Sequence, residues 1–175
     1  MLQHLLREES IGINFQAETR NQALERMIDL LPKHSFKPEQ KRDLLDLMIE
    51  RENFGTTATG EGVALPHCIF SGASFPLASL GISREGVKYP SLGGEPVYLI
   101  FMVILPELED TRKLKAQVLQ LATQIFYDKF LRERLKIATS QEEAYEILLR
   151  ESNYSFPVLQ NSQIQSSFFN QPAVV

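Results

Sequence analysis

The sequence predicts an α/β domain in which helices cover both faces of a central sheet. The clearest strand is Val97–Leu105 (VYLIFMVIL), a continuous apolar run of the kind found in strands that are buried on both faces. Segments with amphipathic helical patterns precede and follow this strand, as expected if helices pack on both sides of the sheet. The length of 175 residues fits one domain with a sizeable core plus a tail.

The first fifty residues predict a strand followed by two helices. Apolar residues alternate over 11–15 and indicate a short strand. Thr19 and Gln22 have the spacing of a capping box, and apolar residues then recur at helical spacing as far as Leu31. Pro38 suits the first position of a second helix, which we expect to end near residue 51.

The middle of the chain predicts short strands separated by loops. The segment 53–62 (NFGTTATGEG) has no hydrophobic period and is interpreted as a loop, and the run 63–65 that follows it as a short strand. Another strand is expected over 77–83. The next segment, 84–96 (REGVKYPSLGGEP), contains glycine and proline and predicts an irregular excursion or a hairpin before the long apolar strand.

Three helices are expected after the long strand. Ser140 and Glu143 have the spacing of a second capping box, at the start of the last helix, and a short helix is expected over 128–137. The domain is therefore expected to span residues 1–151, and the uncharged polar segment 152–175 is predicted to be a tail that is mobile or docked only through Phe168 and Phe169. The first of these helices is predicted by apolar residues spaced four, three and four apart: Leu114, Val118, Leu121 and Ile125.

Composition argues against several classes of partner. With 18 basic and 22 acidic residues the net charge is −4, so no overall field attracts the chain to nucleic acid or to an anionic membrane. No apolar run approaches the roughly 18 residues of a membrane-spanning helix, which predicts a cytoplasmic protein without direct membrane insertion. The single cysteine, Cys68, excludes a disulfide within the chain and a cysteine-based zinc cluster.

The stretch Gly60–His67 (GEGVALPH) places a histidine directly after a proline at the end of a short apolar run. A histidine side chain has an unperturbed pKa of about 6.5, so much of it is neutral and nucleophilic at cellular pH. Taken alone, a Pro-His pair in a short strand is more often a structural turn than a nucleophile. The neighbouring residues therefore decide the interpretation of His67.

Three residues upstream of His67 suit an anionic ligand. Arg51, near the end of the second helix, could offer a fork of donors to a phosphoryl group. Thr56 and Thr57 lie in the glycine-containing loop and could add hydroxyls and close backbone amides. Each alone has an ordinary alternative, a solvated helix residue for Arg51 and plain loop hydroxyls for the threonines.

Taken together, Arg51 to His67 (RENFGTTATGEGVALPH) resembles the active-site signature of enzyme IIA domains of the bacterial phosphoenolpyruvate-dependent phosphotransferase system. The similarity is to the fructose, mannitol and nitrogen-regulatory branch, whose pattern runs Arg-Glu, Gly-Ser-Thr and Gly-Ile-Ala-Ile-Pro-His. It extends from about Leu5 to Glu151 and includes EPVYLIFMVILP and ATSQEEAYEIL in the family's order.

This resemblance implies a three-layer α/β sandwich with a mixed central sheet. It also implies that His67 is the phosphorylated nucleophile, that Arg51 stabilises the phosphoryl charge, and that Thr56 and Thr57 lie at the phosphate. The implied donor is the histidine-containing phosphocarrier protein. The implied acceptor or partner is an enzyme IIB or a regulated target protein, and neither a metal nor a cofactor is implied.

The sequence departs from the family pattern at several positions. Thr56 replaces the usual serine and Ala58 the glycine that follows the signature threonine. A second histidine, usual in the family at the start of the helix after the long strand, is absent. Gapless alignment places Lys115 there, although Lys113, followed by leucine, fits the dipeptide better. An ammonium group could serve phosphate as a point charge, and a solvated lysine is the alternative.

Three functions are compatible with this resemblance. The chain could be a nitrogen-type regulator whose partners change on phosphorylation of His67, the interpretation that we favour. It could instead pass phosphate from His67 to a sugar-specific enzyme IIB during sugar uptake. The third possibility is a partner-binding homologue that is not phosphorylated.

Overall fold

The structure, a computed structural model, describes residues 2–155. These residues form a six-stranded mixed sheet in the strand order β1-β5-β6-β3-β2, with β4 also paired to β6. The elements, in chain order, are α1 (Leu2–Leu5), β1 (Leu6–Ile13), α2 (Arg20–Asp29), α3 (Pro38–Asn53), β2 (Ala58–Gly60), β3 (Val63–Ala64), β4 (His67–Ile69), β5 (Leu77–Val87), β6 (Val97–Leu105), α4 (Thr111–Tyr127), α5 (Lys129–Ile137) and α6 (Gln141–Ser155).

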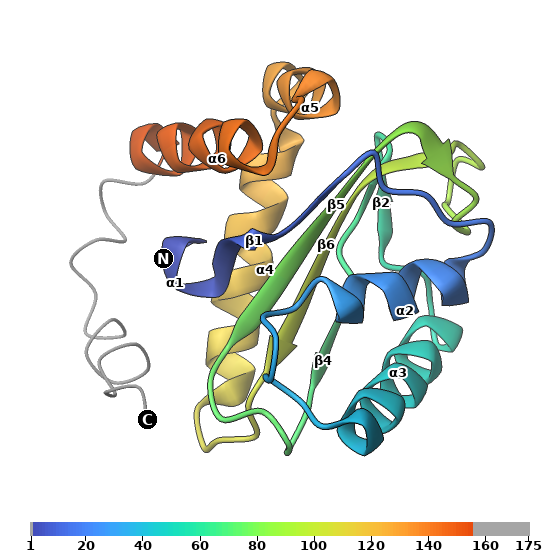
Figure 1. Ribbon diagram of the computed structural model, residues 1–175, viewed down its shortest axis with the longest axis vertical. Helices are drawn as coiled ribbons and strands as arrows, with labels where there is room; N and C mark the ends of the chain where they lie inside the picture. The colour runs from blue at the N-terminus through green and yellow to red at the C-terminus, as the bar shows by residue number, and fades with distance from the viewer. Residues whose placement is uncertain (1, 156–175) are drawn as a thin grey trace.

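Three layers are visible in Figure 1, with α2 and α3 on one face of the sheet and α4, α5 and α6 on the other. Strand β6 lies between β5, with which it pairs antiparallel, and the parallel strands β3 and β4. The predicted three-layer sandwich with a mixed sheet is therefore confirmed. A β6 strand covered on both faces explains why the run 97–105 is apolar without alternation.

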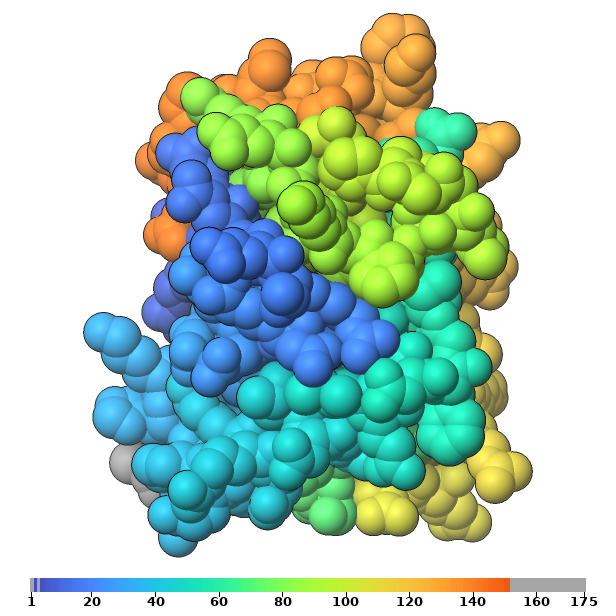
Figure 2. Space-filling view, turned by 90° about the vertical axis from the view of Figure 1, so that its right-hand side faces the viewer, coloured from blue at the N-terminus to red at the C-terminus, as the bar shows by residue number. Residues whose placement is uncertain are grey.

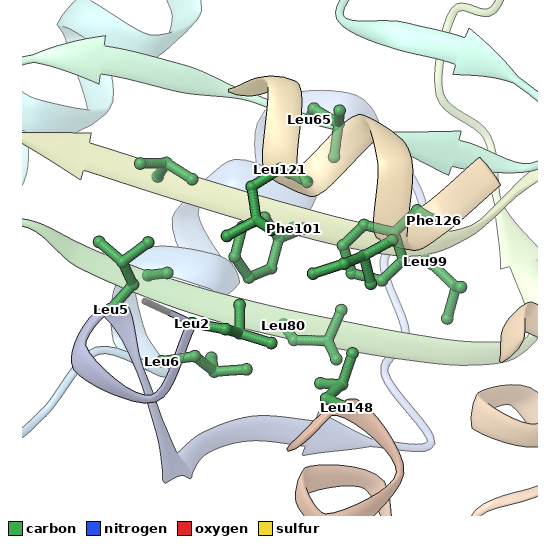
Figure 3. Close-up of a cluster of buried hydrophobic side chains, with 14 of the residues drawn as sticks. Leu2, Leu5, Leu6, Leu65, Leu80, Leu99, Phe101, Leu121, Phe126 and Leu148 are labelled. Atoms are coloured by element: carbon green, nitrogen blue, oxygen red, sulfur yellow. The ribbon is translucent and has the colours of Figure 1, made fainter. Parts of the chain in front are cut away.

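Two separate clusters of buried side chains hold the layers together. One fills the space between the sheet and α4, α5 and α6, and Phe101 of β6 and Phe126 of α4 meet in it at a ring distance of 5.4 Å (Figure 3). The other lies between the sheet and α2 and α3, and includes Met27, Met48 and Met102. Alternate residues of β6 serve the two clusters, so this strand organises both cores.

Both predicted capping residues accept the expected backbone hydrogen bond, but the side chains of Gln22 and Glu143 reach the amides of Glu18 and Thr139, one residue before each cap. The amide of Gln22 donates to Thr19 Oγ1 at 3.2 Å and the amide of Glu143 donates to Ser140 Oγ at 3.1 Å. The predicted strand over 11–15 was placed too late, because β1 begins at Leu6 and pairs parallel with β5. Helix α6 runs to Ser155, past the expected domain end at residue 151, and the rest of the predicted tail lies outside the described residues.

The loop predicted over 53–62 is wrong in part, because β2 lies inside it and forms an antiparallel hairpin with β3. The turn uses three consecutive residues with positive φ, Gly60, Glu61 and Gly62. Such a hairpin is set by backbone conformation rather than by apolar alternation, so the pattern of side chains did not reveal it. The expected hairpin over 84–96 is confirmed, since this segment joins the antiparallel strands β5 and β6.

Strands β3 and β4 are two halves of one interrupted strand beside β6. The residue offset between partners is the same on both sides of the break, from Val63 opposite Leu99 to His67 opposite Val103. Pro66 lies in the break and has no amide to donate, but its carbonyl accepts from the amide of Val103 at 2.9 Å. His67 is therefore the first residue of β4 and not, as the sequence suggested, the end of the preceding strand.

We expect Gly62→Ala to destabilise the fold by about 1–3 kcal/mol. Gly62 has a φ of 74°, and an added Cβ would lie 2.7 Å from Cδ2 of Tyr98 on β6. The matched control is Gly55→Ala, where a Cβ would meet no atom within 4 Å and the free energy of unfolding should barely change. Urea unfolding of both variants measures the difference; equal stability would contradict the role assigned to Gly62.

Candidate functional site

A cleft of about 310 Å³ opens between the end of α3, the start of β4 and the first turns of α4. Three of the predicted site residues, Arg51, His67 and Lys115, lie in its wall. The remaining lining residues are Leu47, Glu50, Phe54, Cys68 and Ile69. The structure thus brings together residues that are far apart in sequence, and two of them are cationic.

The imidazole of His67 is held by its own strand. Nδ1 lies 2.9 Å from the carbonyl oxygen of Leu65. Because a carbonyl oxygen can only accept, Nδ1 must carry the proton in this contact. In the neutral ring the lone pair is then on Nε2, the nitrogen available to react in the cleft.

The environment of His67 favours its neutral form. Burial of the half-buried ring lowers the pKa of His67 below its usual 6.5, and the positive charges of Arg51 and Lys115 lower it further. The carbonyl of Leu65 and the carboxylate of Glu52 act in the opposite direction without reversing the shift. A lowered pKa means that the nucleophilic form prevails at neutral pH.

We expect the ring of His67 to titrate with a midpoint below 6.5 in an NMR pH series. Arg51→Gln removes a positive charge that opposes protonation, so the midpoint should rise in this variant. Asp46→Asn, at an exposed position on the same helix, serves as a control for the substitution itself. A wild-type midpoint at or above 6.5 would contradict the environment described for His67.

Arg51 lies in the last turn of α3, and its Nη1 donates to the carbonyl oxygen of Gly55 at 3.0 Å. This contact fixes the guanidinium beside the loop and leaves its planar fork at the wall of the cleft. Lys115 reaches the same cleft from α4. The side chain of Lys113 is exposed and is not part of the cleft, so of these two lysines only Lys115 lines it.

The two predicted threonines, Thr56 and Thr57, make contacts with neighbouring loops and with Glu52. Thr56 Oγ1 donates to the carbonyl of Pro90 in the 84–96 hairpin and accepts from the amide of Ala58 at 3.1 Å. Thr57 is buried, and its amide donates to Glu52 Oε2 at 3.1 Å. These contacts fix the loop against its neighbours, and a direct contact of either threonine with phosphate stays a prediction.

Cys68 follows the histidine and also lines the cleft. Burial raises the pKa of its thiol to about 12. A thiol with so high a pKa stays protonated at neutral pH and is a poor nucleophile. His67 is therefore the reactive candidate in this cleft.

Glu52 is only 3% exposed, and its sequence pattern did not predict a role for it. A buried carboxylate is costly unless it has partners, and the partners of Glu52 include the loop that it precedes. Its only sequence signal is its place after Arg51 in the signature. Figure 2 shows the 84–96 hairpin above α2 and near the residues that follow α3.

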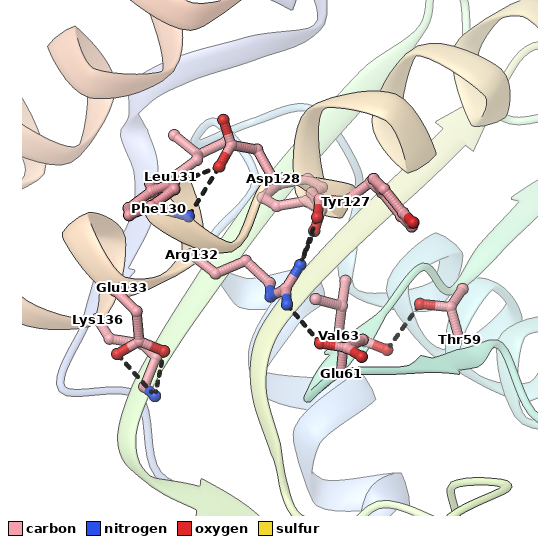
Figure 4. Close-up of polar contacts among 11 residues, drawn as sticks. Thr59, Glu61, Val63, Tyr127, Asp128, Phe130, Leu131, Arg132, Glu133 and Lys136 are labelled. Carbon is pink, nitrogen blue, oxygen red and sulfur yellow. Dashed lines mark hydrogen bonds and ion pairs between the residues drawn. The ribbon is translucent and has the colours of Figure 1, made fainter.

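The turn of the β2–β3 hairpin contacts α5, which in turn contacts the end of α4. Arg132 of α5 donates to the carbonyls of Phe126 and Tyr127 at the end of α4, at 2.9 and 2.8 Å (Figure 4). Its Nη2 also lies 2.6 Å from Glu61 Oε2 at the turn of the hairpin. The hairpin that leads to His67 and the helix that bears Lys115 are thus joined by one buried guanidinium.

A protein-family model described as "Phosphoenolpyruvate-dependent sugar phosphotransferase system, EIIA 2" matches residues 4–151. The chain belongs to this family. The match covers the described domain from the first helix to the end of α6, except for its last few residues. No helix in the described residues is long and apolar enough to span a membrane.

The relatives include both nitrogen regulatory and sugar-specific proteins. The chain is 27% identical to the nitrogen regulatory protein of Pseudomonas aeruginosa, over 81% of this chain and 90% of that protein. It is 28% identical to the fructose-specific EIIABC component of Bacillus subtilis, over 82% of this chain but only 22% of that longer protein. A crystal structure of the nitrogen regulatory protein IIA-Ntr from Neisseria meningitidis superimposes with a TM-score of 0.72 at 27% identity, and the match covers 84% of this chain and 98% of that one.

Proposed function

We propose that this protein is a phosphohistidine carrier with a regulatory, nitrogen-type role, phosphorylated on His67 by the histidine-containing phosphocarrier protein. Family membership supports phosphoryl transfer in general. The single observation that supports the specific site is the hydrogen bond from His67 Nδ1 to Leu65, which leaves the lone pair on Nε2 in a cleft that Arg51 and Lys115 also line. A site of this kind suits an incoming phosphoryl group, whose charge lies on its equatorial oxygens.

The transfer needs no proton to leave His67. The bond between phosphorus and the donor nitrogen breaks while a bond between phosphorus and Nε2 forms, and the donor imidazole leaves with its electron pair. Nδ1 keeps its proton, so the ring of His67 gains positive charge, which the carbonyl oxygen of Leu65 stabilises. Arg51 and Lys115 stabilise the negative charge on the oxygens of the transferred group.

The regulatory role is supported by the similarity to a nitrogen regulatory protein over nearly its whole length. A phosphoryl dianion added at an open cleft changes the charge and the hydrogen-bond acceptors that a partner meets, which is how such a switch could work. The alternative is transfer from His67 to a fructose- or mannitol-type enzyme IIB during sugar uptake. The similarity to the fructose-specific protein supports that alternative.

Incubation with phosphoenolpyruvate, enzyme I and the phosphocarrier protein tests the proposal. We expect an acid-labile phosphate on the wild-type protein. Purified enzyme IIB proteins of the fructose and mannitol type are then added: retention of the label with each of them supports the regulator, and rapid loss to one supports the sugar-transport alternative. An unlabelled wild-type protein would leave only the partner-binding homologue.

We expect Lys115→Gln to slow phosphorylation about tenfold, because a cation near the transferred group is lost. The control is Lys113→Gln, two residues away on α4 with an exposed side chain outside the cleft, which should keep the wild-type rate. Initial rates of labelling at limiting phosphocarrier protein compare the two variants. Equal rates for both would reject a role for Lys115.

A further inference from the structure

Glu52 is linked to His67 by three hydrogen bonds that pass through the backbones of Thr57 and Leu65. Its Oε2 accepts from the amide of Thr57 at 3.1 Å. The carbonyl of Thr57 accepts from the amide of Leu65 at 3.1 Å, and the carbonyl of Leu65 accepts from Nδ1 of His67 at 2.9 Å. Three contacts thus connect a carboxylate at the end of α3 to the imidazole on β4.

Each contact in this series restrains the next one. Glu52 is fixed by α3, and its carboxylate sets the position of the Thr57 backbone just before β2. Thr57 in turn fixes the backbone of Leu65 at the break between β3 and β4, where regular ladder pairing is interrupted and Pro66 supplies no amide. The carbonyl of Leu65 at this break is the group that orients the ring of His67.

The surroundings of Glu52 show that its carboxylate is held in an enclosed place. Its Oε1, Thr57 Oγ1 and the hydroxyl of Tyr89 are all buried, and the hydroxyl of Tyr89 interacts with both Glu52 and Thr57. Tyr89 belongs to the 84–96 hairpin, and burial and the nearby Glu52 both raise the pKa of its hydroxyl. Keeping a carboxylate in such a place costs free energy, which an apolar side chain would have avoided.

We propose that Glu52 is a positioning residue for His67, which acts through the backbones of Thr57 and Leu65 to keep Nδ1 protonated and Nε2 directed into the cleft. This inference rests on the proposed function in so far as it concerns phosphoryl transfer. The effect is mainly geometric. The amide and the carbonyl of Thr57 belong to different peptide groups, as do those of Leu65, so each hydrogen bond acts on the next by fixing the position of the backbone. The negative charge of Glu52 adds a smaller effect, favouring the protonated ring.

Three substitutions separate geometry from charge. Glu52→Gln keeps an oxygen that can accept from Thr57 but removes the charge. Glu52→Asp keeps the charge but shortens the side chain, so that the contact to Thr57 is lost. Glu52→Ala removes both, and Asp46→Ala, at an exposed position on the same helix, is the control.

Two measurements are made on each variant: the ring tautomer of His67 from its 15N chemical shifts, and the labelling rate with saturating phosphocarrier protein. We expect Glu52→Asp and Glu52→Ala to lose the preference for a protonated Nδ1 and to be labelled about 10- to 100-fold more slowly, the loss typical of a misplaced reacting group. Glu52→Gln should keep the wild-type tautomer and most of the rate, with a lower titration midpoint for His67. If Glu52→Ala does not fold, Glu52→Asp and Glu52→Gln still give opposite expectations.

Two results would overturn the inference. One is a wild-type tautomer and rate in Glu52→Asp, and the other is a Glu52→Gln variant as impaired as Glu52→Asp. A wild-type protein that is never labelled would instead refute the proposed function, while the tautomer measurement, which needs no phosphate donor, would still test the role of Glu52.

Discussion

His67→Ala is expected to abolish phosphorylation by the phosphocarrier protein. The thiol of Cys68 beside it in the cleft cannot replace the imidazole, because burial keeps it protonated at neutral pH. Arg51 and Lys115 can stabilise a phosphoryl group, but without the ring no nucleophile accepts it. Labelling with radioactive phosphoenolpyruvate, followed by gel electrophoresis under alkaline conditions, measures the effect.

The matched control is His34→Asn. His34 lies between α2 and α3 with a φ of 72°, and asparagine tolerates this left-handed conformation better than most residues. This variant should be labelled like the wild type. Label that persists on His67→Ala, or disappears from His34→Asn, would place the phosphorylated group elsewhere.

Arg51→Gln is expected to slow labelling about 100-fold, the size of loss seen when one preorganised donor to a transition-state charge is removed. The guanidinium is fixed by its hydrogen bond to the Gly55 carbonyl, and Arg51 lines the cleft with His67. The substitution also raises the pKa of His67, so the rate should be compared at pH 8, where the ring is neutral in both proteins. The loss measured there reports stabilisation of the phosphoryl group and not a change in protonation.

Two further variants test whether the effect of Arg51 depends on its planar fork and on its position. Arg51→Lys keeps the positive charge without the planar fork and should lie between the wild type and Arg51→Gln. Arg42→Gln removes an exposed arginine earlier on α3 and should leave the rate unchanged. A wild-type rate in Arg51→Gln at pH 8 would show that the guanidinium does not contact the transferred group.

The layers of the fold were predictable because local signals agree with them. The capping pairs at Thr19 and Ser140 mark helix starts that the hydrogen bonds confirm. The apolar run 97–105 predicted a strand covered on both faces, and β6 has that position. The β2–β3 hairpin was missed because it depends on positive φ at the turn, including the non-glycine residue Glu61, and on its contact to Arg132.

The site was predictable only in part. The signature placed His67 and Arg51, but sequence spacing could not choose between Lys113 and Lys115, which point about 200° apart on a helix. The choice depends on how α4 packs against the sheet, with Leu114 and Val118 buried. Glu52 was missed for a similar reason, because its enclosure depends on Tyr89 from the distant 84–96 hairpin.

Which ring nitrogen of His67 carries the phosphoryl group can be determined by NMR. A 1H–15N spectrum of the 15N-labelled protein, recorded after incubation with phosphoenolpyruvate, enzyme I and the phosphocarrier protein, makes the distinction. We expect coupling of phosphorus to Nε2 and a protonated Nδ1, because Nδ1 donates a hydrogen bond to the Leu65 carbonyl. Phosphate on Nδ1 of His67, or on a residue outside the cleft, would contradict the account.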